Sequence, residues 1–390
     1  MAQYSPKKII RSICKPLLKR YFDSRGLLDG FDWAEYEQGD PKPIIEALDA
    51  LPSDDQTAVD TDLYTVNELA TDGGSRLIYE EAAFWKRPWA DELGSMANDC
   101  ERALLAIIED RDLVETALAY NEIDRFAESK WRRWNVGKRL QVTDDEQQRE
   151  KLKKALRAIF KEEGRGARCH IETLDRRDPE RFCCFAYPED YPKTDLGYDD
   201  QDRFSRHTRR TATEIVFVYQ PEEGVLEMVA SGDKNRKEKI AEAFCKHILG
   251  LNALPDARSN PPYNLDVLKR GDFAFRTEAE DNIESVELRL LRFDLPGKGY
   301  RRLVLSGRPT PEVPNVLRSL IEEAINTTKL PLTELLVSQA RLSFKFRGRD
   351  GKRGKTLTFE VTYPDRCNLK DQGYDAVARK YLAKWGIASG

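Results

Sequence analysis

The chain has 390 residues, of which 40% are hydrophobic and 34% charged, and its formal net charge is −4. A chain of this length forms two or three domains with cores of their own, so it needs no covalent cross-links for stability. The small net charge does not exclude a local basic patch, because opposite charges cancel in the sum.

Several classes of protein are excluded. No apolar run approaches the ~20 residues of a membrane span, and the N-terminal lysines are not followed by the apolar segment of a signal peptide. The seven cysteines are scattered and include no CxxC pair, which is typical of reduced thiols. We therefore expect a cytoplasmic protein that contacts no membrane and carries no cofactor or metal.

The first 165 residues show helical signals throughout. Pro6 opens a first helix, and Pro16 is expected to bend or interrupt it. Thr143 and Glu146 form a capping box at the start of the last helix of this region. Further helices are predicted for residues 43–51, 53–70, 76–84, 90–134 and 143–163. No strand is expected here, so residues 1–165 are predicted to form an all-helical domain.

The pattern changes after residue 164. Residues 168–174 and 181–187 have the composition of strands, and residues 188–210 are predicted to be a long polar loop. A hairpin followed by an amphipathic helix then occurs three times. The three units are predicted at 213–219, 225–230 and 234–249; at 285–293, 300–305 and 311–326; and at 341–347, 355–363 and 371–385.

The third unit shows how the sheet is packed. Leu342, Phe344 and Phe346 alternate with polar residues, so one face of the strand is buried and the other is wet. Each helix has one apolar stripe, which predicts that the helices cover the buried face. The predicted fold class is therefore α+β: the helical domain, then an antiparallel-sheet domain at 166–390 built of hairpin–helix units with helices on one face. Segment 252–281 contains prolines and is a candidate boundary within this second domain.

Basic residues with interleaved tryptophans suggest a nucleic-acid interface. Arg and Lys bind phosphate oxygens, and exposed Trp side chains stack on bases. The predicted nucleic-acid-binding residues are Lys130, Trp131, Arg132, Arg133, Trp134, Lys138, Arg139, Arg347, Arg349, Lys352, Arg353 and Lys355. A third basic group lies at the end of the long polar loop and consists of Arg203, Arg206, His207, Arg209 and Arg210. A solvated charged surface, with Trp131 and Trp134 anchored in the core, is the alternative interpretation.

Signals for catalysis are weak. The three histidines, His170, His207 and His247, have no metal-ligand neighbour at a useful spacing. Phosphate-binding and nucleophile motifs such as GxxxxGK[ST], GxGxxG and GxSxG are missing. The carboxylates that remain as candidates for a hard cation are Asp199, Asp200 and Asp202, or the pair Glu214 and Glu227.

Three functional hypotheses follow. The first is a non-catalytic component of a larger, bacterial-type assembly that binds nucleic acid, DNA in preference to RNA, or a partner protein through its basic patches. The second is a metal-dependent nuclease or phosphoesterase that uses the carboxylates named above. The third is a scaffold that binds only proteins. No family resemblance favours one of them.

Overall fold

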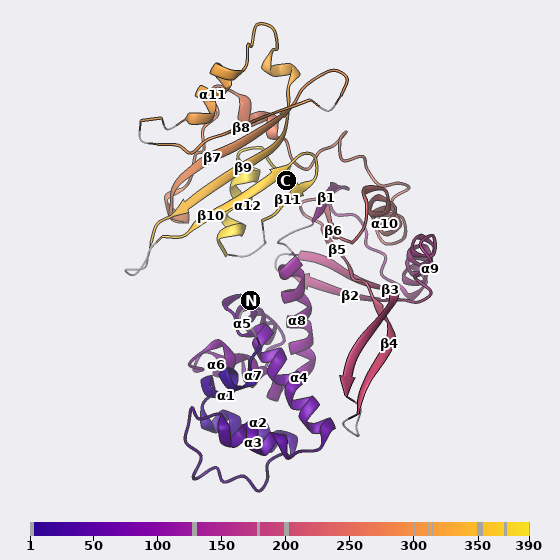
Figure 1. Ribbon diagram of the computed structural model, residues 1–390, viewed down its shortest axis with the longest axis vertical. Coiled ribbons are helices and arrows are strands. Elements are labelled where there is room, and N and C mark those ends of the chain that lie inside the picture. Colours follow the sequence, from indigo (N-terminus) through magenta and orange to yellow (C-terminus); the bar gives the residue numbers. More distant parts are fainter. Residues whose placement is uncertain are drawn as a thin grey trace. The chain divides into compact units, whose positions relative to one another are not determined.

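The computed structural model describes residues 4–126, 131–177, 180–198, 203–299, 301–310, 312–313, 315–348, 354–369 and 373–389. The chain divides into two compact units, Met1–Arg125 with Tyr198–Phe204, and Phe126–Gly197 with Ser205–Gly390. Helices and two antiparallel sheets confirm the predicted α+β class (Figure 1). Among the helices it describes, none is both long and apolar enough to cross a membrane.

The first unit is helical, as the sequence predicts. Its helices are α1 (Pro6–Ser12), α2 (Lys15–Arg25), α3 (Lys42–Asp49), α4 (Ser53–Leu69), α5 (Asp72–Phe84), α6 (Ala90–Leu93), α7 (Asp99–Glu109) and α8 (Arg111–Phe126). The chain breaks at Ile13 and Cys14, between α1 and α2. The predicted breaker Pro16 lies in the first turn of α2. Helix α7 is the centre of the unit, because it contacts α1, α2, α4 and α5 and buries Leu104 and Leu105 completely.

A buried carboxylate links three helices of this unit. Asp62 on α4 is 2% exposed. Tyr21 donates a hydrogen bond to its Oδ2 atom at 2.8 Å, and Arg25 contacts the same oxygen at 2.5 Å. Arg111 of α8 binds the other oxygen at 2.8 Å. These partners replace the hydration that the carboxylate loses, which makes its burial tolerable.

The second unit begins with a six-stranded sheet in the order β1-β6-β5-β3-β2, with β4 paired to β3. Helices α9 and α10 cover one face, and Phe244 of α10 stacks on Phe217 of β5 with ring centroids 4.4 Å apart (Figure 1). The elements are β1 (Arg132–Asn135), α9 (Glu146–Lys161), β2 (Cys169–Arg177), β3 (Glu180–Tyr198), β4 (Phe204–Ala212), β5 (Ile215–Gln220), β6 (Val225–Val229) and α10 (Lys234–His247). The first predicted hairpin–helix unit is thus confirmed as β5, β6 and α10.

Strand β1 corrects the sequence prediction, which assigned residues 90–134 to a helix and expected no strand before residue 165. Arg132–Asn135 pair antiparallel with β6. The chain after β1 follows the β5–β6 turn, where Val136 donates its backbone N–H to the Gly224 carbonyl at 2.8 Å. Gly224 has a φ of +72°, and a Cβ there would lie 2.8 Å from backbone of Gly137. The strand with which β1 pairs is about 90 residues away, so no local pattern reveals the pairing. This pairing overrides the helical signal of residues 132–134.

The predicted polar loop at 188–210 is wrong for its described residues, which continue β3 and form β4. These two strands make a ribbon that projects from the sheet. Both faces of the ribbon are exposed, so the alternation of apolar and polar residues that usually marks a strand is missing.

A five-stranded sheet completes the second unit, in the order β11-β10-β9-β7-β8. Its elements are β7 (Ile283–Asp294), β8 (Arg302–Ser306), α11 (Val316–Ala324), β9 (Leu336–Phe346), β10 (Thr356–Thr362), β11 (Arg366–Cys367) and α12 (Gly373–Lys384), with 3-10 turns η1 (Leu265–Lys269), η2 (Ala279–Asp281) and η3 (Leu332–Glu334). Ile321 of α11 and Tyr381 of α12 share one core with Phe344. The second and third hairpin–helix units are thereby confirmed, with their helices on the packed face.

Candidate nucleic-acid interface

Four of the predicted binding residues lie in the interior of the second unit. Trp131 and Trp134 are 5% and 3% exposed, and Arg132 and Arg133 are 9% and 6% exposed. Trp134 belongs to the core beneath the six-stranded sheet. Both tryptophans therefore lie in the interior, as the alternative interpretation expected, and little of either ring is open for stacking on a base.

The two arginines of β1 are held by carboxylates. Arg132 forms a buried ion pair with Asp365, in the turn before β11. Arg133 contacts Glu223 at 2.5 Å and Glu227 at 3.4 Å. Burial lowers the pKa of Arg133, but Tyr263 and the two glutamates outweigh this and raise it, so the guanidinium is charged. Arg133 thus ties β1 to its neighbour β6 in the six-stranded sheet, and Arg132 ties it to the turn before β11 in the five-stranded sheet.

The other predicted residues that the structure describes are exposed. Lys138 and Arg139 follow β1, and Arg347 and Lys355 flank the β9–β10 turn. Arg139 forms a two-pronged ion pair with Glu222, with both distances 3.0 Å. The two pairs of residues sit at different sheets, so the structure does not gather them into one surface. Lys130, Arg349, Lys352 and Arg353 lie outside the described residues.

The β3–β4 ribbon brings together basic and aromatic side chains that the predicted residue set did not include. Thr194 and Thr208 hydrogen-bond across the ribbon at 3.1 Å, which fixes the two strands' relative register. Because side chains alternate along a strand, Arg206 and Arg210 share the Thr208 face. Phe204 also lies on that face and contacts Tyr198 with ring centroids 5.8 Å apart.

This face is open to solvent. Tyr198 and Phe204 are 74% and 56% exposed, and Arg206 and Arg210 are exposed as well. β4 contains Arg206, Arg209 and Arg210 and no acidic residue. Arg209 points to the opposite face, where it pairs with Asp195. Arg210 of the first face contacts Glu189 at 3.2 Å, so each face has one arginine that is paired with a carboxylate.

The base of the ribbon is fixed by a charged cluster. Arg165 is buried and bridges Glu163 at 2.7 Å and Asp190, at the root of the ribbon, at 2.6 Å. Tyr191 donates a hydrogen bond to the Glu163 carbonyl at 2.7 Å. Hydrogen bonds from Arg165 and Arg236 lower the pKa of Glu163. The ribbon is thus held at its root, and most of the described residues at 191–198 and 203–212 are exposed.

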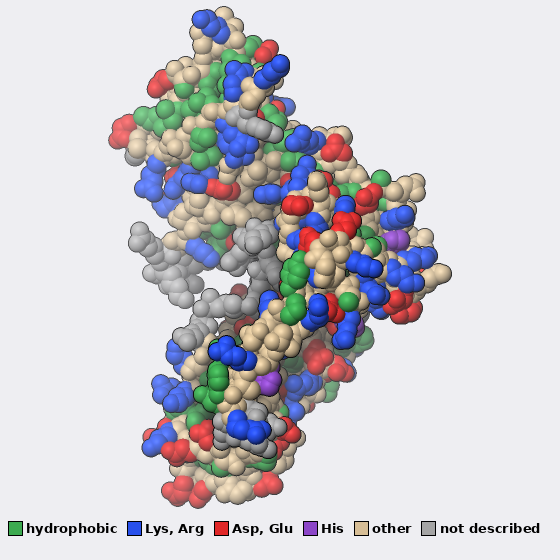
Figure 2. Space-filling model, turned by 45° about the vertical axis from the view of Figure 1, so that its right-hand side comes forward, with side chains coloured by type: hydrophobic (Ala, Val, Ile, Leu, Met, Phe, Trp, Pro, Cys, Tyr) green, Lys and Arg blue, Asp and Glu red, His purple; other side chains and the backbone are tan. Residues whose placement is uncertain are grey.

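Elsewhere on the molecule, basic and acidic residues alternate. Figure 2 shows Lys and Arg interspersed with Asp and Glu over the visible face, without one broad basic field. Polar cross-strand pairs explain part of this pattern on the wet face of the five-stranded sheet, where Arg341 contacts Glu360 at 2.5 Å and Lys345 contacts Glu284 at 2.6 Å.

The carboxylates of the nuclease hypothesis have different positions. Glu227 is 3% exposed and binds Arg133, Arg379 and Gln220. Its oxygens are therefore engaged by protein donors. Asp199, Asp200 and Asp202 lie outside the described residues. Within the part of the chain that the structure describes, no three His, Cys, Asp or Glu side chains are grouped to hold a metal ion.

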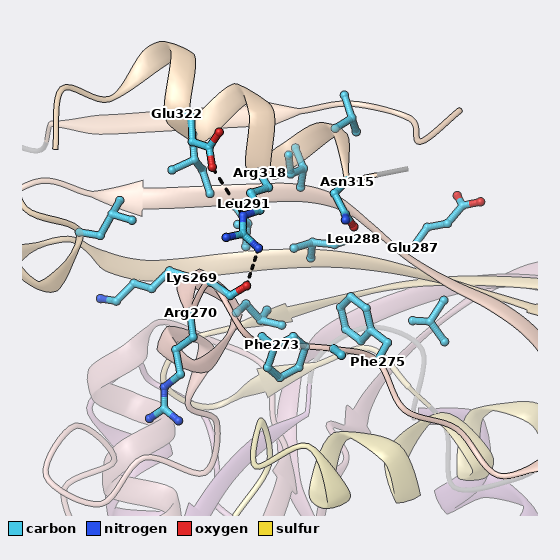
Figure 3. Close-up of a pocket in the computed structure, with 18 of the residues that line it drawn as sticks. Lys269, Arg270, Phe273, Phe275, Glu287, Leu288, Leu291, Asn315, Arg318 and Glu322 are labelled. Atoms are coloured by element: carbon cyan, nitrogen blue, oxygen red, sulfur yellow. Dashed lines mark hydrogen bonds and ion pairs between the residues drawn. The ribbon is translucent and has the colours of Figure 1, made fainter. Parts of the chain in front are cut away.

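A cavity of about 490 Å³ lies between η1, β7 and α11 (Figure 3). Its floor is apolar and includes Phe273, Phe275 and Leu288. Arg318 reaches from α11 across the cavity to the carbonyl of Gly271, and Glu322 approaches it from the same helix at 3.5 Å. The arrangement can hold an apolar group beneath a rim of charges. None of its residues was predicted as a site, because they come from segments around η1, β7 and α11, which are separated in the sequence.

The sequence was also compared with known proteins. No model of a protein family matches the chain, and no curated protein matches it.

Proposed function

We propose that this protein binds nucleic acid, and that the β3–β4 ribbon is its principal contact. The observation that carries the proposal is one exposed ribbon face on which Arg206 and Arg210 lie beside the aromatic pair Tyr198 and Phe204. Guanidinium groups bind phosphate oxygens, and exposed aromatic rings stack on bases or pack against sugars. A surface with both features is suited to nucleic acid, which carries anionic phosphates and planar bases.

Ribbon geometry favours duplex DNA. The major groove of B-DNA admits a two-stranded antiparallel ribbon, whereas the deep and narrow major groove of A-form RNA does not. Strand β4 has nine residues, and at ~3.4 Å per residue it is ~30 Å long. That length is sufficient to cross the groove and reach the phosphates on both sides. Lys138, Arg139, Arg347 and Lys355 are exposed and are proposed as secondary phosphate contacts.

A partner protein is the second candidate, because among the described strands β4 pairs with β3 alone, which leaves its outer edge without a neighbouring strand. Unpaired N–H and C=O groups along such edges accept an additional strand from another chain. Pairing of this kind depends on the backbone, so it is insensitive to replacement of Arg206 and Arg210. Sensitivity to these two side chains therefore separates the two candidates.

The test is a salt titration of binding to a labelled duplex, with single-stranded DNA and RNA as competitors. For each phosphate contact that is removed, the slope of log K against log salt should fall by ~0.9. We expect the double variant Arg206→Ala, Arg210→Ala to lose ~1.8 in slope. The matched control is Lys298→Ala, Arg302→Ala, which removes the same charge from the β7–β8 hairpin and should leave the slope unchanged.

Two results would contradict the proposal. One is the absence of binding to all three nucleic acids at low salt. The other is an equal loss of slope in the ribbon variant and in the control, since that would reflect net charge alone. Cleavage of plasmid or RNA that requires Mg²⁺ or Mn²⁺ would instead support the nuclease hypothesis. In the aromatic variant Tyr198→Ala, Phe204→Ala, we expect weaker binding with an unchanged salt slope, because stacking releases no counterions.

A further inference from the structure

The apolar face of the five-stranded sheet is covered unevenly. On β9, the side chains of Leu342 and Phe344 are fully buried. Their cross-strand partners on β7 are Leu288 and Val286, which pack against the same core but are only half-buried. Directly opposite residues of an antiparallel pair lie on one face of the sheet. Strand β7 therefore has less cover on this face than its neighbour β9.

The length of the covering helix explains the difference. Helix α11 packs on β7 and β8 and has nine residues, so at ~1.5 Å per residue it is ~14 Å long. Strand β7 has twelve residues and is ~40 Å long at ~3.4 Å per residue. The helix covers only part of the strand, and the cavity of about 490 Å³ lies next to it, over Val286, Leu288 and Leu291.

Aromatic rings form another wall of this cavity. Phe273 and Phe275 follow η1 and meet edge to face, with ring centroids 5.0 Å apart. Both side chains are half-buried, and Figure 3 shows their rings across the cavity from α11. The volume falls in the ~300–1,000 Å³ range of small-molecule pockets, which are lined mainly by apolar and aromatic side chains. The cavity thus has the size and the lining of a site for a small apolar molecule.

One charged side chain reaches into this apolar space. Arg318 extends from α11 and donates a hydrogen bond to the Gly271 carbonyl (Figure 3). Glu322 lies 3.5 Å from its Nε atom, beyond the ~3.2 Å limit of a usual N–H···O hydrogen bond. Glu322 is also 71% exposed, so water weakens the attraction. Since a guanidinium has more N–H donors than these contacts use, Arg318 can donate to a ligand.

The remaining charged residues of the described wall are directed elsewhere. Lys269 and Glu287 are held in ion pairs of their own, at 2.9 Å and 2.7 Å. Figure 3 shows Lys269 and Arg270 pointing away from the two phenylalanine rings. Arg318 is therefore the charged group that a ligand on the apolar wall meets.

We propose that this cavity binds a small aromatic carboxylate. The ring of the ligand buries the half-exposed apolar surface of Phe273, Phe275 and Leu288, and edge-to-face contact between rings adds to the affinity. Its carboxylate lies against Arg318, whose planar guanidinium matches a carboxylate with two parallel N–H···O bonds. The site contains no residue of the β3–β4 ribbon, so the proposal does not rest on nucleic-acid binding.

The experiment is calorimetric titration of the full chain with cinnamate and with cinnamyl alcohol, its uncharged counterpart. Cinnamate should bind about tenfold more tightly, because a hydrogen bond between two charged groups is stronger than one to a neutral group. Arg318→Gln should weaken cinnamate binding about tenfold and leave that of the alcohol unchanged. The matched control, Arg341→Gln, lies on the wet face of the same sheet, outside the cavity wall, and should change neither affinity.

A second variant locates the ligand. Leu288→Trp places a larger side chain in the cavity and should abolish binding of both compounds, and urea denaturation shows whether this variant is folded. Where it fails to fold, the comparison of Arg318→Gln with Arg341→Gln decides the inference. The ribbon variant Arg206→Ala, Arg210→Ala should keep its cinnamate affinity, so the ribbon and the cavity succeed or fail separately.

Three results overturn the inference. The first is the absence of cinnamate binding to the unmodified chain. The second is unchanged cinnamate affinity in a folded Leu288→Trp chain, since the ligand then lies elsewhere. The third is an equal loss of both compounds in Arg318→Gln, because a lost carboxylate contact affects only cinnamate.

Discussion

Strands β1 and β4 are both rich in arginine and aromatic residues, but they have opposite environments. In β1 the side chains of Arg132, Arg133 and Trp134 are buried. In β4, Phe204 and Arg206 are exposed. The two strands belong to one sheet, so neither composition nor secondary structure separates them. The difference is what lies beside each strand.

Carboxylates from distant parts of the chain decide the environment of β1. Glu227 and Asp365, which bind Arg133 and Arg132, are 94 and 233 positions away in the sequence. A buried arginine is tolerated when such partners replace its hydration. Among the described strands, β4 pairs with β3, and its Arg206 side chain is exposed. The tertiary neighbours of an arginine-rich strand thus decide whether its arginines stabilise the fold or remain exposed to a ligand.

The largest expected effect of this contrast is on stability. We expect Arg133→Ala to lower the free energy of unfolding by about 3–5 kcal/mol, because it leaves the buried Glu227 with less than its full set of partners. Arg206→Ala is expected to change it by less than about 0.5 kcal/mol, as for other exposed side chains. Urea denaturation of both variants measures the difference. Equal losses in the two variants would mean that burial does not separate the strands.

Much of the fold follows from local patterns. Phe344 and Phe346 alternate with polar residues because one face of β9 is buried, and this period-two pattern located the third hairpin from sequence alone. The helix breaker Pro16 and the turn at residues 296–299 were equally local signals. Such features depend on neighbours within a few residues, so a single sequence is sufficient to find them.

The candidate site was less predictable for the same reason. Trp131 and Trp134 satisfy the composition of a stacking surface, but a strand pairing with β6 buries them. The ribbon was missed because both of its faces are wet, and a strand without a buried face has no apolar period.

A smaller effect is expected at the root of the ribbon, where the side chain of Glu163 is 36% exposed. Hydrogen bonds from Arg165 and Arg236 lower the pKa of Glu163, so this group stabilises the fold fully above its unfolded pKa of ~4.3. That stabilisation is lost as pH falls through the lower, folded pKa. We expect Glu163→Gln to flatten the fall in the free energy of unfolding between about pH 5 and pH 3. Glu334→Gln, an exposed control on η3, should retain the wild-type slope in chemical denaturation.

The smallest effect is expected at Arg139, which belongs to the same basic segment as Arg133 but is exposed. Its side chain and that of its partner Glu222 are 76% and 61% exposed, so water and salt screen the ion pair. Arg139→Ala should therefore leave the urea midpoint unchanged, and as a secondary phosphate contact it should lower the salt slope of DNA binding by no more than ~0.9. Glu222→Gln is the control, since it breaks the same pair without removing a cation. A midpoint shift in Arg139→Ala as large as that in Arg133→Ala would show that the whole basic segment is structural, and the contrast between β1 and β4 would then extend beyond the strand itself.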